Sequence, residues 1–132
     1  QSKTNMNVAY SYLAMENINS DTPLLYRPKH KIRFTTIQKT SFVDILFSIK
    51  YTSSQLYEDF LSNDHPIVDN IVIFPLETLP QTIITNASIT KTIDTYDFIF
   101  KIKNLFDSQY VMIQHYPMPG RNFEISINRK II

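Results

Sequence analysis

The chain has 132 residues, with nine phenylalanines, eight tyrosines, one glycine, no cysteine and a formal net charge of +1. This length fits one domain with a core of its own, and the lack of cysteine excludes disulfides, thiolate metal sites and a cysteine nucleophile. A charge so close to zero disfavours general nucleic-acid binding, which requires a clear basic excess. No run of about 18 apolar residues occurs, so no membrane-spanning helix is expected.

The N-terminal residues are polar and small, and we expect a flexible tether over residues 1–5 before a single domain over residues 6–132. From Met6 to Met15, Val8, Tyr10 and Tyr12 alternate with polar or small residues, which predicts a strand. Asparagine, serine, aspartate and proline then follow over residues 16–23 and predict a turn-rich connection.

The next stretch is basic, with no acidic residue between Leu24 and Thr40. A short strand is expected around Ile32 and Phe34. One interpretation is a solubilising loop or an edge strand protected by lysines. The other is a contact surface for an acidic partner or for anionic lipid headgroups, because tyrosine and arginine often anchor interfaces. The candidate partner-binding residues are Tyr26, Arg27, Lys29, Lys31, Arg33 and Phe34.

Phe42 to Tyr51 predicts another strand, and the segment after it predicts the one helix of the chain. Ser53 is suited to cap a helix over residues 53–64, with Leu56, Tyr57 and Phe60 at helical spacing. Such a short helix needs packing against a sheet to be stable.

The second half of the chain contains further strand signals. Ile71–Phe74 is a brief strand followed by two prolines, which favour a sheet edge, and Thr82–Ile93 alternates threonine with isoleucine. Tyr96 to Pro117 holds two apolar runs around a polar break at 104–109, which we expect to pair as the centre of a sheet. Phe123–Asn128 predicts the last strand. Many short strands with turn signals between them indicate an all-β fold, an antiparallel β-sandwich with one added helix.

No motif recommends an enzyme, a cofactor or a metal. The histidines His30, His65 and His115 lack metal-binding spacing. A single glycine excludes a glycine-rich phosphate loop. Glu58 and Asp59 fall on the predicted helix, where an exposed polar face explains them without catalysis.

The order of these elements resembles the TssJ family, the outer-membrane lipoproteins of type VI secretion systems. The segment FVDILFSIKYTSSQLYEDF, from Phe42 to Phe60, is similar to the strand and Asp-Phe-containing helical stretch of that family. Tyr96 to Asp107, Gln109 to Pro119 and Phe123 to Asn128 follow its later order of strands. The arginine, tryptophan and glycines typical of the family are missing or scarce here.

The resemblance implies a small transthyretin-like β-sandwich on the periplasmic face of the bacterial outer membrane, held by lipids on a cysteine that would precede Gln1. It also implies that the connection over about 17–40 binds the periplasmic part of the inner-membrane protein TssM. On this hypothesis the chain is a non-enzymatic subunit that fastens a secretion complex to the outer membrane. The alternative is a β-sandwich binding module or lipoprotein of another secretion or adhesion assembly, and a small hydrolase is the third interpretation.

Overall fold

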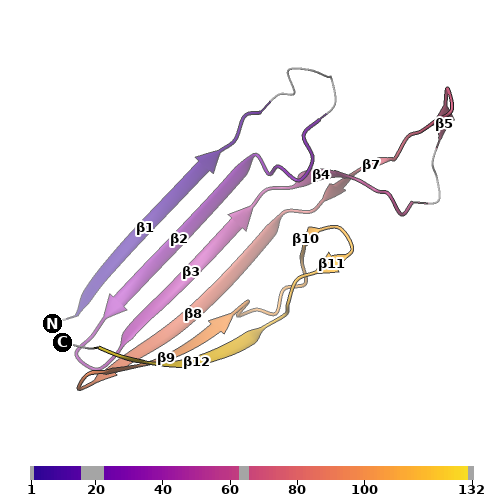
Figure 1. Ribbon diagram of the computed structural model, residues 1–132. Helices are drawn as coiled ribbons and strands as arrows, with labels where there is room; N and C mark the ends of the chain where they lie inside the picture. The colour runs from indigo at the N-terminus through magenta and orange to yellow at the C-terminus, as the bar shows by residue number, and fades with distance from the viewer. Residues whose placement is uncertain (1, 16–22, 63–65, 131–132) are drawn as a thin grey trace.

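The computed structural model describes residues 2–15, 23–62 and 66–130, and all regular elements in these ranges are β-strands. The all-β expectation is therefore confirmed. Six strands form one antiparallel sheet in the order β1-β2-β3-β8-β9-β12 (Figure 1). The long strands therefore lie side by side in the same order in which they follow one another along the chain. These strands are β1 (Lys3–Tyr12), β2 (His30–Lys39), β3 (Asp44–Thr52), β8 (Thr82–Ile93), β9 (Tyr96–Lys103) and β12 (Asn122–Arg129).

The connections of this sheet alternate between short and long. Residues 40–43 and 94–95 make tight turns at one end, which we call the short-turn end. The described parts of the long connections, residues 13–15, 23–29, 53–62, 66–81 and 104–121, lie at the opposite end, which we call the loop end (Figure 1). Three two-stranded ribbons lie within the long connections: β4 (Gln55–Glu58) with β7 (Leu76–Leu79), β5 (Ile67–Val68) with β6 (Ile71–Val72), and β10 (Val111–Ile113) with β11 (Tyr116–Pro117).

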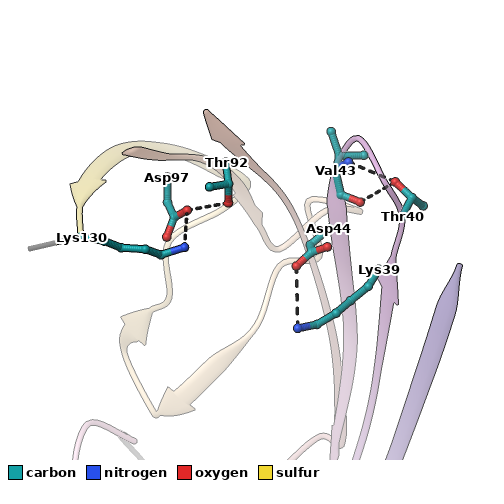
Figure 2. A network of polar contacts seen from close by, with 7 residues as sticks. All are labelled: Lys39, Thr40, Val43, Asp44, Thr92, Asp97 and Lys130. Carbon is teal, nitrogen blue, oxygen red and sulfur yellow. Dashed lines mark hydrogen bonds and ion pairs between the residues drawn. The ribbon is translucent and has the colours of Figure 1, made fainter. Parts of the chain in front are cut away.

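Polar contacts fix the short-turn end (Figure 2). The Thr40 hydroxyl donates to the Val43 carbonyl at 2.7 Å and accepts from the Val43 amide at 3.0 Å, which closes the turn between β2 and β3. The Asp97 carboxylate accepts from the Thr92 hydroxyl at 2.6 Å and pairs with Lys130 at 3.1 Å. The hydrogen bond from Thr92 and the cation of Lys130 both lower the pKa of Asp97.

The predicted helix over residues 53–64 is wrong where the structure describes the segment. Gln55–Glu58 is the strand β4, paired with β7, and a turn follows at 60–61. The segment is so short that the spacing of its apolar residues fits a strand as well as a helix. A lone helix of this length is marginal in water, whereas the β7 partner supplies hydrogen bonds and lets Tyr57 be buried.

The predicted central pair is also wrong. β9 pairs with β8 and β12, whereas the run after it forms only the small ribbon β10–β11. Asn104 ends β9 in the left-handed region, with φ 52°, and its side-chain amide holds Ser108 through bonds of 2.8 and 2.9 Å. This turn directs the chain away from β9, so β12 takes the neighbouring position. At the N-terminus, β1 already begins at Lys3, within the range expected as a tether.

The large sheet is a single layer in the part of the chain that the structure describes. The other described strands form only ribbons, so they provide no second sheet of similar size. The accessible surface is 10312 Å², whereas a compact monomer of this length exposes about 7,200 Å². Much apolar surface is therefore exposed. None of the described residues forms a helix that could span a membrane.

Candidate functional site

The strand register divides the side chains of the large sheet into a mainly apolar and a more polar face, although Lys91 and Arg129 share the first and Ile37, Leu46, Ile84 and Ile99 share the second. We call them the apolar face and the polar face. The aromatic and aliphatic residues of the apolar face are Met6, Val8, Tyr10, Tyr12, Ile32, Phe34, Ile45, Phe47, Ile49, Tyr51, Ile83, Ile89, Ile93, Tyr96, Phe98, Phe100, Ile102, Phe123, Ile125 and Ile127. The alternate positions form the polar face, and its charged residues are Lys3, Lys31, Arg33, Lys39, Asp44, Lys50, Asp97, Lys101, Lys103 and Glu124.

In β9 and β12, exposure on the two faces is the reverse of that in a water-soluble sheet. In β12, Ile125 is 78% and Ile127 60% exposed, whereas the alternating residues Glu124 and Ser126 are half-buried. β9 repeats this pattern, with exposed Phe98 beside a half-buried Asp97. A large exposed apolar patch marks an interaction site for a protein, a membrane or a ligand.

Tyrosines lie at both ends of the apolar face. At the loop end, the Tyr10 hydroxyl lies 2.9 Å from Nδ1 of His30, and the Tyr51 hydroxyl donates to Gln81 at 3.0 Å. At the short-turn end, the Arg129 guanidinium lies 5.9 Å from the centre of the Tyr96 ring. Tyrosine is favoured where one end of a side chain is in an apolar phase and the other in water.

The ribbon β4–β7 organises the loop end. Tyr57 and Leu79, 6% and 2% exposed, are the most buried large apolar side chains among the described residues. Burial, with the negative charges of Asp59 and Glu77, raises the pKa of Tyr57 above its ordinary value. The densest apolar packing therefore lies in a connection, outside the large sheet.

This ribbon also joins the three long connections. The Tyr26 amide donates to the Leu56 carbonyl at 2.8 Å, which attaches the first connection. The Gln55 side chain donates to the Met112 carbonyl at 3.0 Å, and Asp59 lies 3.5 Å from Nε2 of His115, which attaches the third. The three connections thus form one surface.

A cavity of 410 Å³ lies where this surface meets the polar face. Its lining combines apolar side chains of the connections with cations of the sheet. Among these residues are Tyr26, Lys31, Lys50, Met112, Tyr116 and Met118. A concave, mostly apolar site with a few polar groups is the usual form of a ligand pocket. This cavity is the candidate binding site.

The structure separates the six residues predicted to bind a partner. Tyr26 and Lys31 line the cavity, whereas Arg27 and Lys29 line a neighbouring hollow at the loop end. Arg33 lies on the polar face and Phe34 on the apolar face, because successive residues of β2 point to opposite sides. The sequence did not predict Lys50, Met112 and Met118 as site residues, although all three line the cavity. Lys50 lies beside Arg33 only because β2 pairs with β3, and the sequence alone does not show that pairing.

Carboxylates of the polar face are engaged in ion pairs. Glu124 contacts Lys101 at 2.7 Å and Lys103 at 2.8 Å. The hydrogen bonds from Lys101 and then Lys103 lower the pKa of Glu124 from 4.5 to about 2. The stability that this lowered pKa provides is present above pH 4.5 and is lost as the pH falls toward 2.

Replacing Glu124 with glutamine is therefore expected to lower the free energy of unfolding at pH 6 but not at pH 2. Unfolding followed by circular dichroism at a series of pH values measures this difference. Glu58→Gln serves as the matched control, because Glu58 lies in β4 and has no ion pair among the described residues. A Glu124→Gln effect that persists undiminished at pH 2 would contradict the ion-pair explanation.

The histidines show no metal arrangement in the described part of the chain. His30 lies between Tyr10 and Tyr12, with ring centroids at 6.2 and 5.2 Å, and His115 contacts Asp59. His65 lies outside the described residues. No group of three histidine or acidic side chains that could hold a metal ion occurs among those described.

No family model matches the chain, and no curated protein matches it.

Proposed function

We propose that this chain is a non-enzymatic part of a bacterial outer-membrane protein. Its apolar face contacts the lipid acyl chains, and its loop end binds a ligand or partner at the membrane surface. The observation that carries the proposal is the reversed exposure of β9 and β12, in which large apolar side chains are more exposed than the polar residues that alternate with them. Lipid is the phase that stabilises such a surface.

The dimensions of the sheet support the same proposal. Its strands have 8 to 12 residues, and a strand needs about 9–11 residues to cross a bilayer at a tilt. Long connections at one end and short turns at the other are typical of outer-membrane sheets. The tyrosines at both ends of the apolar face occupy the positions of an interfacial aromatic belt.

Within lipid, the edges of the sheet also need partners. β1 and β12 each pair on one side only among the described strands. Each backbone amide or carbonyl group that has no hydrogen-bond partner in lipid destabilises the protein by about several kcal/mol. The proposal therefore includes further strands, from the same protein or another copy, that pair with β1 and β12.

Tryptophan fluorescence tests the lipid contact directly, because the chain contains no tryptophan. The protein, produced from its complete gene, is reconstituted in vesicles that contain brominated phospholipids. Phe98→Trp on the apolar face is expected to be strongly quenched, because bromine quenches by contact. Ser126→Trp on the polar face is expected to be quenched much less. Equal quenching of the two, or none, would overturn the proposal.

The type VI role remains a second candidate, favoured by exposed Arg27 and Lys29 at the loop end, in the connection that the TssJ resemblance assigns to a TssM-like partner. This candidate requires an N-terminal lipid anchor and a second layer over the apolar face to complete a transthyretin-like sandwich. A tryptophan at position 98 that is shielded from water yet not quenched by brominated lipid would favour it over the first proposal.

A further inference from the structure

Three cations gather at the loop end of the polar face. Arg33 in β2 lies directly opposite Lys50 in β3, so their Cβ atoms are about 5 Å apart. Lys31 lies two residues before Arg33 in β2, on the same face, and the two residues are about 7 Å apart. Like charges placed so closely on one face repel each other and lower the stability of the sheet. This arrangement therefore favours a bound anion.

No described carboxylate forms an ion pair with these three cations. The acidic residues of the polar face are paired elsewhere: Asp44 with Lys39, Asp97 with Lys130, and Glu124 with Lys101 and Lys103. These pairs lie toward the short-turn end and along β9 and β12. The polar face is thus neutralised in one region and positively charged in the other.

The cationic region opens into the 410 Å³ cavity, because Lys31 and Lys50 line it on one side. The lining also includes Tyr26, Tyr116 and the flexible thioethers of Met112 and Met118. Aromatic rings and methionine side chains adapt well to flat apolar groups. One site therefore combines positive charge with an apolar lining, and its volume is suited to a small molecule.

We propose that Lys31, Arg33 and Lys50 form an anion subsite for a small organic anion. Its phosphate or carboxylate group binds the cations, and its apolar or aromatic body occupies the cavity beneath the third connection. This inference deepens the loop-end binding of the proposed function and rests on it. It does not depend on lipid contact at the opposite face.

The test measures binding to the reconstituted full protein by titration calorimetry, with phenyl phosphate and benzoate as the probes. Inorganic phosphate reports the anion contact alone. We expect at least one aromatic anion to bind more tightly than inorganic phosphate and more weakly as salt is raised. Lys50→Gln is expected to weaken that binding by about tenfold or more, because a charge-assisted hydrogen bond is lost.

Two controls make the result specific. Lys3→Gln removes the same charge from the polar face at the short-turn end and is expected to leave binding unchanged. Lys50→Arg retains the cation and is expected to retain most of the affinity. An equal loss in Lys3→Gln, an unaffected Lys50→Gln, or inorganic phosphate binding as tightly as both aromatic probes would overturn the inference.

Failure of this inference and failure of the lipid contact have different signatures. A protein whose Phe98→Trp variant is quenched by brominated lipid, but which binds none of the three probes, retains the membrane role and loses the anion subsite. Binding without quenching retains the subsite and overturns the lipid contact.

Discussion

Replacing Ile125 with lysine is expected to destabilise the protein in lipid vesicles by about 2–4 kcal/mol, because a cation near the middle of a lipid-facing strand is transferred out of water. Ile125 is 78% exposed and lies near the centre of β12. If the apolar face were in contact with water, the same substitution would change stability by no more than about 0.5 kcal/mol. The two environments therefore predict clearly different results. Equilibrium unfolding from vesicles with urea measures the change.

The neighbouring residue provides the control for this substitution. Ser126 follows Ile125 in β12 and points to the polar face, opposite Ile99. Ser126→Lys adds the same side chain at nearly the same depth, but on the side that the proposal assigns to water. Ser126→Lys is expected to lower the stability in vesicles much less than Ile125→Lys does. Equal costs for the two lysines would show that the faces do not differ in environment, and would contradict the lipid contact.

Replacing Leu79 with alanine is expected to lower the stability of the loop end by about 2–5 kcal/mol, the usual cost of removing a buried leucine side chain. Leu79 is 2% exposed and belongs to the ribbon that also holds buried Tyr57. Since this ribbon bonds to the first and third connections, its opening also disturbs the cavity. Amide hydrogen exchange of β4 and β7 measures the local free energy of opening.

Leu76 gives a matched comparison within the same strand. It is 46% exposed, so Leu76→Ala removes the same atoms without leaving a cavity. We expect its effect on the exchange of β4 and β7 to remain within about 0.5 kcal/mol. Similar effects of the two substitutions would contradict the assignment of Leu79 to the packed centre of the loop end. Leu79→Ala should also weaken binding of an aromatic anion, through disorder of the lining.

The two proposed contacts use opposite faces of the same strands. Alternate residues of β2 and β3 place Phe34 and Ile49 toward the apolar face, and Arg33 and Lys50 toward the polar face. A sheet that contacts lipid on one side can therefore hold a charged ligand site on the other without a second layer. The long connections complete that site, because they are attached to one another through β4 and β7.

The sequence alone determined the strands with strong alternation. The period of two is local, so the strands at Thr82–Ile93 and Phe123–Asn128 were predicted close to their observed positions. The same alternation assigns Phe98 and Phe100 to one face and Asp97 and Lys101 to the other, whatever the partner strand is. The all-β class follows from these patterns.

Only the tertiary structure decided pairing, because pairing depends on where a turn sends the chain. The left-handed Asn104 turns the chain away from β9, and this prevented the predicted pair from forming. The strand at Gln55–Glu58 is stabilised by a partner strand in which Leu79, 24 residues later, pairs with Gln55. The local pattern favoured a helix equally well. Short segments take the structure that their distant partners stabilise.

The sequence alone likewise did not predict what surrounds the apolar face. An alternating strand looks the same whether its apolar side meets a second sheet or lipid, because both are apolar. The sequence therefore predicted a sandwich, whereas the described strands form one layer with its apolar side exposed. The cation cluster of Arg33 and Lys50 also depends on cross-strand register, which joins residues that are far apart in the chain.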